Sequence, residues 1–224
     1  AVWQGRQENG NWDLFVVDLE NPASIQRATD TPTFNEVNPA IDYPWIVFQR
    51  KSISAPDDPF ALRAIHLETL ETVDIWAGPE DQLDPSIHGG RVVWQDFRDP
   101  GFGEIYFQDL ETGQAARITD NSFGQYFPNI RDDWVVWQDN RNGQVDIYGY
   151  NFLSGEEVQL TNTPANEAHP YLDNGWVLYE DDSFGFEVEN FQILNLDSRR
   201  SAPLTRNDSD KEDGGIAGGW LIWE

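Results

Sequence analysis

One short motif, an aliphatic pair followed by an aromatic residue, recurs six times along this chain and constrains its fold more than any other feature. The aromatic residues of the six copies are Trp3, Phe48, Trp94, Trp137, Tyr179 and Trp223. The copies follow one another at a nearly constant interval of roughly 44 residues over the whole chain, and a period between 20 and 50 residues is typical of repeat architectures.

Other positions keep the same register. A second apolar strand follows each motif after a polar turn, as in Trp12–Leu19 and Glu104–Leu110. A third short segment ends in Thr, as at Thr119 and Thr161, and a fourth carries Pro-x-Ile or Pro-x-Leu, as at Pro128. Four short β-rich strands in about 44 residues are typical of one propeller blade. No segment shows a sustained helical period, so we expect few helices.

The sequence therefore predicts an all-β fold: one five-bladed β-propeller of four-stranded antiparallel blades, forming a single domain over residues 1–224. The expected repeats are 1–44, 45–90, 91–133, 134–175 and 176–219, followed by a closing strand at 220–224.

The best-preserved repeat resembles a known family. Residues 135–148 read Val-Val-Trp-Gln-Asp-Asn-Arg-Asn-Gly-Gln-Val-Asp-Ile-Tyr, and they are followed by Gln159-Leu-Thr and His169-Pro-Tyr-Leu. This pattern is similar to the TolB-type (WD40-like) β-propeller repeat of bacterial and archaeal secreted proteins. The resemblance covers nearly the whole chain. It implies an exported, extracellular or envelope-exposed propeller that serves as a binding or scaffolding surface, with the Pro-x-Ile strand innermost in each blade.

The two ends of the chain do not balance. A closed ring of five blades has room for five copies of the aliphatic-aromatic strand, yet six are present, so Val2 and Trp3 compete with Leu221, Ile222 and Trp223 for one place. Three outcomes remain open for this surplus terminal strand. It packs outside the ring, it belongs to a longer repeat array from which this segment is cut, or it pairs with another copy of the chain, since sheet edges template pairing.

Charge excludes two classes of partner. The 224 residues contain 40 acidic and 14 basic side chains, so the formal net charge is −26. Such a surface repels nucleic acid backbones and anionic lipid headgroups, and no apolar run is long enough to insert into a membrane. Divalent cations, cationic partners and uncharged glycans remain as partner classes. Cysteine is absent, which excludes disulfides and thiolate sites.

Acidic turns link the first two strands of several repeats and suggest calcium as a cofactor. Asp96 precedes Glu104, and Asp139 precedes Asp146; a further set at Asp181 and Asp182 precedes Glu187. Oxygen ligands gathered by a turn could hold Ca²⁺. The alternative is structural: Asp-x-Arg, as in Asp139 and Arg141, forms a pair that caps the turn.

Positions beside the Pro-x-Ile segment vary while the rest of the repeat does not, as expected for a ligand surface at the rim of the central channel. The residues before the prolines are Asn38, Asp84, Phe127 and His169, with Asp213 in a degenerate fifth copy. The residues after the Ile or Leu are Asp42, His88, Arg131 and Asp173. Unconstrained drift at loop ends is the alternative interpretation. The repeated Trp residues are better explained by packing between blades than by sugar stacking.

Catalysis is not predicted. The three histidines, His66, His88 and His169, are far apart in the sequence, and neither a His-x-x-x-His pair nor a Gly-x-Ser-x-Gly elbow occurs. The first function hypothesis is a non-catalytic module that recognises a protein or a glycan at the channel rim. The alternative is a structural subunit of an extracellular assembly or fibre that associates with copies of itself through its terminal strands.

Overall fold

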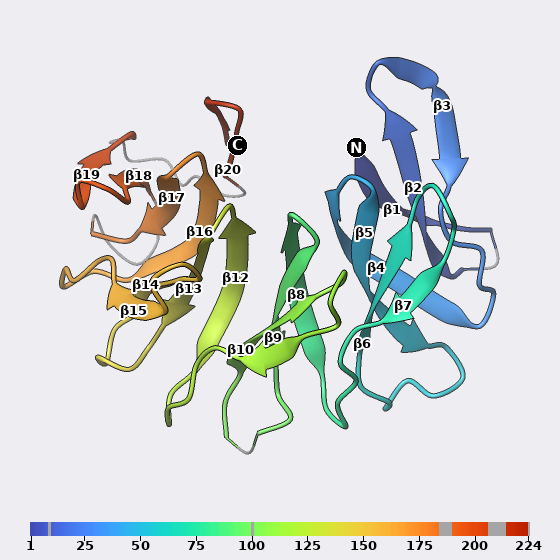
Figure 1. Cartoon of the computed structure of the whole chain (residues 1–224), viewed down its shortest axis with the longest axis horizontal. Coiled ribbons are helices and arrows are strands. Elements are labelled where there is room, and N and C mark those ends of the chain that lie inside the picture. Colours follow the sequence, from blue (N-terminus) through green and yellow to red (C-terminus); the bar gives the residue numbers. More distant parts are fainter. Residues whose placement is uncertain (9, 100, 184–189, 206–213, 224) are drawn as a thin grey trace. The chain divides into compact units, whose positions relative to one another are not determined.

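The structure, a computed structural model, describes residues 1–8, 10–99, 101–183, 190–205 and 214–223. These residues form 21 β-strands and no helix (Figure 1). All strand pairs are antiparallel, and strands that follow one another in a sheet also follow one another in the chain. The prediction of an all-β fold is confirmed. The described residues hold one strand more than five four-stranded blades require.

The chain divides into two compact units, residues 1–100 with 105–117 and residues 101–104 with 118–224, which are described separately. The prediction of a single domain over residues 1–224 stays a prediction.

The first unit contains one three-stranded and two four-stranded sheets. We call β4–β7 the second blade and β8–β11 the third blade. The strands are β1 Val2–Arg6, β2 Trp12–Asp18, β3 Asn21–Arg27, β4 Phe34–Asp42, β5 Trp45–Ser52, β6 Ala61–His66, β7 Thr72–Asp74, β8 Gln82–His88, β9 Arg91–Asp96, β10 Glu104–Asp109 and β11 Ala115–Arg117.

The second unit contains two four-stranded sheets and a terminal hairpin. We call β12–β15 the fourth blade and β16–β19 the fifth blade. The strands are β12 Gln125–Arg131, β13 Trp134–Asp139, β14 Asp146–Asn151, β15 Glu156–Gln159, β16 Glu167–Asp173, β17 Trp176–Asp181, β18 Asn190–Asn195, β19 Arg200–Pro203, β20 Gly215–Ala217 and β21 Trp220–Ile222.

Each four-stranded sheet is the antiparallel meander of a propeller blade. The Pro-x-Ile segment forms the first strand, which is an edge of its sheet, and the aliphatic-aromatic motif forms the second. β-branched and aromatic residues favour these strands, and Gly or Asn with positive φ closes the turns between them, as at Gly155. The predicted repeats begin at residues 45, 91, 134 and 176, between the first and second strands of the sheets, so each sheet combines the last strand of one repeat with three strands of the next.

Both competing terminal strands have a place in the structure. β1 pairs with β2 along the full length of β1, from Val2 opposite Val16 to Arg6 opposite Trp12. β21 pairs with β20 and forms the terminal hairpin. Each copy of the motif is therefore paired within its own unit.

Hydrophobic clusters lie between successive sheets rather than inside one sheet. In the first unit, Val47 of the second blade packs with Val92 and Trp94 of the third. In the second unit, Val136 of the fourth blade packs with Leu172 and Val177 of the fifth. A four-stranded sheet has two apolar faces, and stacking on its neighbours removes both from water.

The repeated aromatic position is buried in the middle of the chain and exposed at its ends. Trp94 and Trp137 have no exposed surface, which confirms the prediction that they pack between blades. Trp3 and Trp223 are not buried as predicted, since they are 38% and 45% exposed, but the Trp223 ring still lies 6.3 Å from that of Phe191 in the fifth blade. These two side chains lie at the three-stranded sheet and the terminal hairpin, which lack the strands that complete the other blades.

Candidate functional site

The first strand of each four-stranded blade carries a bulge at the residue before its proline. Pairing with the second strand shifts register at this point in all four blades. The bulged residues are Asn38, Asp84, Phe127 and His169, with φ between 46° and 52°. Left-handed φ at a residue other than glycine costs on the order of 1–2 kcal/mol, and a bulge re-aims a side chain. The four predicted rim residues thus share one strained backbone geometry.

A repeated glutamine of the preceding sheet holds the bulge. The backbone N–H of Asn38 donates to Oε1 of Gln4 at 2.7 Å, and that of Asp84 donates to Oε1 of Gln49 at 3.1 Å. In the second unit the N–H of His169 donates to Gln138 at 3.2 Å.

These glutamines follow the repeated aromatic residue directly, so their repetition was visible in the sequence. Their role in holding the bulge was not predicted, because the side-chain oxygen of each glutamine accepts a hydrogen bond from the backbone of the next sheet.

Neighbouring bulged residues contact one another within each unit. In the first unit, Nδ2 of Asn38 donates to Oδ1 of Asp84 at 3.0 Å. In the second unit, the rings of Phe127 and His169 meet edge to face with centroids 4.7 Å apart, and His169 also hydrogen-bonds Glu180. The structure therefore brings together one polar pair and one aromatic pair. Asp213 lies outside the described residues.

The second predicted row, at the ends of the first strands, also forms one pair in each unit. Nδ1 of His88 lies 3.7 Å from Oδ2 of Asp42, and Nε of Arg131 lies 3.6 Å from Oδ1 of Asp173. Asp42 additionally accepts a 2.7 Å hydrogen bond from the N–H of Gly89, and it lines a pocket of about 410 Å³. Each pair joins neighbouring blades.

The acidic turns are occupied by protein donors. In the third blade, buried Asp96 accepts hydrogen bonds from Nε1 of Trp94 at 2.8 Å and from the backbone N–H, Nε and Nη2 of Arg98 at 2.9, 2.8 and 2.6 Å. In the fourth blade, buried Asp139 accepts from Trp137 and in the same way from Arg141. The structure thus forms the Asp-x-Arg turn cap. We call each Asp, its Trp and its Arg a latch.

The latch arginines are covered by aromatic rings. The guanidinium of Arg98 lies 4.6 Å from the ring centroid of Trp76 and 4.7 Å from that of Tyr106. The guanidinium of Arg141 lies 4.2 Å from the ring centroid of Tyr148, and its Nη1 donates to Glu157 at 2.6 Å. Cation–π contact and charge-assisted hydrogen bonds act together on each guanidinium.

The latch lowers the pKa of Asp96. Burial alone would raise this pKa, but hydrogen bonds from Arg98 and Trp94 favour the charged form and outweigh it.

The remaining predicted calcium ligands are also hydrogen-bonded. Glu104 accepts from the hydroxyl of Thr119 at 2.6 Å, and Asp146 accepts from Nδ2 of Asn142 at 2.8 Å and Nε2 of Gln159 at 3.1 Å. In the described part of the chain, no three His, Asp or Glu side chains are arranged to hold a metal ion. Glu187 lies outside the described residues. Calcium binding stays a prediction, and the hydrogen bonds favour the structural alternative.

Comparison with known proteins places this arrangement in a fold. No protein-family model matches the sequence, and no curated protein matches it. The structure is similar to that of TolB from Acinetobacter baumannii, with a TM-score of 0.69 and 18% identity over 99% of this chain. It is also similar to a propeller in a nidogen/laminin complex, with a TM-score of 0.67 and 11% identity over 99% of this chain and 84% of that chain.

A puromycin hydrolase also matches, with a TM-score of 0.71 and 12% identity over 99% of this chain and 41% of the hydrolase. This chain spans 60% of the length of the Acinetobacter TolB. At these identities the comparisons establish the fold, which is a TolB-type β-propeller whose sheets fit five blades. The described residues include no helix long and apolar enough to cross a membrane.

Proposed function

We propose that this chain is a non-catalytic binding propeller, exposed at the cell envelope or outside the cell, that holds a protein or glycan ligand on the first strands of its blades. One observation carries the proposal. The same strained bulge recurs in four blades, but the side chain that it presents is different in each: Asn38, Asp84, Phe127 and His169. Backbone strain that the surrounding structure maintains is a feature of binding surfaces.

The framework around the bulge supports the same interpretation. Gln4, Gln49 and Gln138 hold the bulged backbone with a side-chain oxygen, so the bulge does not depend on which residue occupies it. A repeated scaffold that carries non-repeated side chains is how repeat proteins build specific binding surfaces. The proposal includes export and an extracellular location because the repeats resemble those of secreted TolB-type proteins.

The test is a screen of the intact chain against a printed glycan array and a displayed random-peptide library. We expect a saturable hit whose affinity falls at least about tenfold in Asp84→Ala or His169→Ala, since a central contact contributes about 1.4 kcal/mol or more. Ser122→Ala, at an exposed loop position, is the matched control. Hits that both folded variants retain at full affinity would contradict the proposal.

A second candidate function, self-association through the terminal strands, is favoured by the surface of β21. Trp220 is 81% exposed and Ile222 is 72% exposed, and the partner of β21 in the described structure is β20. An edge strand with exposed apolar side chains is a template for pairing with another copy. Light scattering over a concentration series tests this, with Ile222→Lys and with chains trimmed of residues 1–4 or 221–224. A mass that stays at 25.6 kDa at every concentration excludes the self-association function.

A further inference from the structure

The fifth blade lacks the arginine that completes the latch in the third and fourth blades. Its turn begins with Asp181 at the position of Asp139, and Ser183 stands two residues later, where the fourth blade has Arg141. Asp181 is 5% exposed and accepts hydrogen bonds from the backbone N–H and the hydroxyl of Ser183. No arginine or lysine of the described residues forms an ion pair with Asp181. The connection from Asp182 to Glu189 contains no basic residue either.

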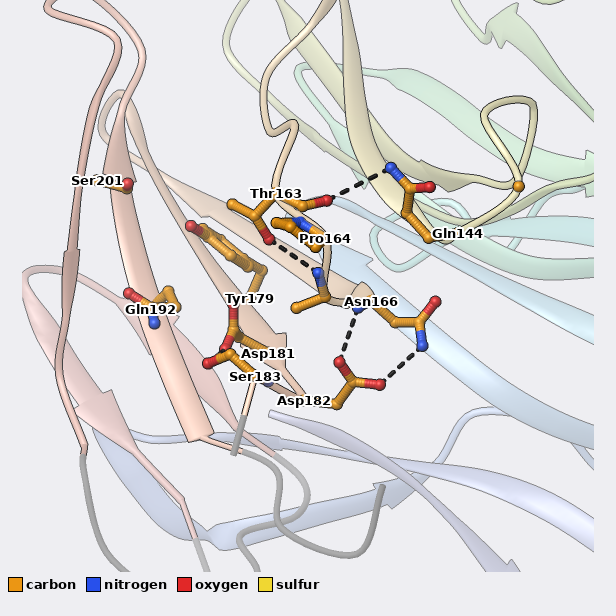
Figure 2. Close-up of a pocket in the computed structure, with 12 residues that line it drawn as sticks. Gln144, Thr163, Pro164, Asn166, Tyr179, Asp181, Asp182, Ser183, Gln192 and Ser201 are labelled. Atoms are coloured by element: carbon orange, nitrogen blue, oxygen red, sulfur yellow. Dashed lines mark hydrogen bonds between the residues drawn. The ribbon is translucent and has the colours of Figure 1, made fainter. Parts of the chain in front are cut away.

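The neighbours of the missing guanidinium are smaller as well. Strand register places Tyr179 where the fourth blade has Trp137, Gln192 where it has Tyr148, and Ser201 where it has Glu157. Each of the three replacements removes volume from one side of the same space. All three residues line a pocket of about 890 Å³, together with Asp181 and Ser183 (Figure 2).

The other wall of the pocket comes from the segment that enters the fifth blade. Figure 2 shows Thr163 and Pro164 on this segment, facing the strands that carry Tyr179 and Gln192. Asp182 at the mouth is engaged, because its two carboxylate oxygens accept the backbone N–H of Asn166 at 2.8 Å and its Nδ2 at 2.7 Å. Two carboxylates line the pocket. Asp182 is held by Asn166, whereas Asp181 is held by Ser183 alone among the described side chains.

A second carboxyl group lies behind the wall of the pocket. Glu167 lies opposite Asp181 in the strand register, is fully buried, and its Oε2 has no hydrogen-bond partner among the described residues. Burial raises the pKa of Tyr179 to about 12, and the charges of Glu167 and Asp181 add to the rise. Glu167 is not one of the residues that line the pocket. Burial raises the pKa of Glu167 to about 7, so above that pH a ligand in the pocket would feel its charge without touching it, which favours binding of a cation over acid catalysis.

The other sheets show what this position accommodates. Asp96 pairs with Arg98 and Asp139 pairs with Arg141, and each lies opposite a glutamine, Gln82 or Gln125. In the second blade Arg50 itself takes this place, 3.9 Å from Glu36 opposite it. These three blades thus place a guanidinium from their own sequence at this end, and the fifth blade presents two carboxyl groups without one.

We propose that the fifth-blade pocket binds the guanidinium of an arginine side chain from a partner protein, seated on Asp181 as Arg141 is seated on Asp139. The volume exceeds what a guanidinium needs, so the arginine stem and adjoining peptide fit with it. Gln192 and Ser201 offer oxygen acceptors to the remaining N–H groups. A planar five-donor fork matches a carboxylate in two-point contact, which an ammonium does not. The net charge of −26 attracts a basic partner at long range.

The probe is an acetylated and amidated Gly-Gly-Arg-Gly-Gly peptide, with counterparts that carry lysine or the neutral isostere citrulline at the centre. Binding to the intact chain is followed by amide NMR at low ionic strength. We expect saturable shifts at the pocket and affinity for the arginine peptide about tenfold or more above both counterparts. Equal affinity for the three peptides would overturn the proposal. Affinity no higher than that of free argininamide would overturn the assignment to a partner protein.

Three variants make the test specific. Ser183→Arg supplies the missing guanidinium from the chain itself and should abolish binding while raising the melting temperature. Ser122→Arg adds the same charge at an exposed loop and should leave affinity within about twofold. Asp181→Asn keeps the shape and should also abolish binding, so the test holds even if the arginine variant fails to fold. Unchanged affinity in a folded Asp181→Asn chain would refute the proposal.

Discussion

Glu167 lies directly opposite Asp181 on the neighbouring strand, so two buried carboxyl groups face each other in the fifth blade. The third blade has Gln82 and Asp96 at these positions, and there Nε2 of the glutamine donates to the carboxylate at 3.1 Å. Burial raises the pKa of Glu167 to about 7 in spite of hydrogen bonds from Thr163 and Thr161, and the charges of Asp146 and Asp181 raise it further. Stability therefore depends on pH at this point of the fold.

Replacing Glu167 by Gln should remove that dependence. The pKa is higher in the folded chain than its ordinary value of 4.5, so the wild type loses stability as pH rises from about 4.5 through 7. We expect Glu167→Gln to exceed the wild type in free energy of unfolding by on the order of 3 kcal/mol at pH 8 and to equal it near pH 4. Urea unfolding over a pH series measures this, with exposed Glu156→Gln as the control. A wild type that is as stable at pH 8 as at pH 4 would contradict it.

Replacing Arg98 by Gln should destabilise the third blade, because it leaves Asp96 buried without its cation. Removing one partner of a buried pair costs about 3 kcal/mol or more. The lowered pKa of Asp96 adds stability above the ordinary carboxyl pKa, and this is lost as pH falls through the folded-state value. The loss in Arg98→Gln should thus be largest at neutral pH and shrink in acid. The double variant with Asp96→Asn should regain part of it, and a double variant no better than Arg98→Gln would argue against the pairing.

At the bulged position of Phe127, a glycine variant should be more stable than an alanine variant. Phe127 has a φ of 52°, which glycine adopts without strain. Both Phe127→Gly and Phe127→Ala lose the ring contact with His169, so their difference reports the backbone, and we expect glycine to be more stable by about 1 kcal/mol. Thermal unfolding measures the pair. At Tyr126, the preceding strand residue, we expect the opposite order by about 0.5–1 kcal/mol; the same order at both positions would exclude the strain.

Gln4 and Gln49, which accept hydrogen bonds from the bulges, should differ in their contribution to stability because Gln49 is buried and Gln4 is exposed. Oε1 of Gln49 accepts from Nδ2 of Asn38 at 2.6 Å and from the N–H of Asp84 at 3.1 Å, and the Gln49 side chain is buried. Gln49→Ala leaves both donors without this acceptor, so we expect a cost on the order of 2 kcal/mol. Exposed Gln4 accepts one bond, and Gln4→Ala should cost under about 1 kcal/mol because water replaces it. Equal costs in urea unfolding would show that the glutamines do not hold the bulges.

The sequence predicted those features that recur at constant spacing. Trp94 and Trp137 mark equivalent places in two blades, and the same spacing located the second strand and the turn after Asp139. Strand register inside a blade follows, because Val135 and Val136 point to opposite faces of the sheet and a slip by one residue would exchange the two faces. The Asp-x-Arg cap was one of two alternatives for the acidic turns, and the structure forms it.

Other features were not predictable because they depend on groups that meet only in three dimensions. The change from Arg141 to Ser183 can be read from the repeats alone. The pocket also needs Tyr179, Gln192 and Ser201, which lie on three different strands. The left-handed bulge at Phe127 gave no signal either, since proline restricts the residue before it without fixing a positive φ. Both proposed binding sites therefore lie where the side chains depart from the repeat.

The facing carboxyl groups of Glu167 and Asp181 also have a consequence for the order in which the blades open. Local opening of a repeat protein follows the free energy of each repeat and its contacts. At neutral pH the fifth blade carries an uncompensated buried charge, so its amide hydrogens should exchange with solvent sooner than those of the fourth blade, whose Asp139 is latched by Arg141. In mild acid the difference should narrow as Glu167 binds a proton. An arginine peptide seated on Asp181 should slow exchange in the fifth blade alone, which makes hydrogen exchange a map of occupancy as well as of stability.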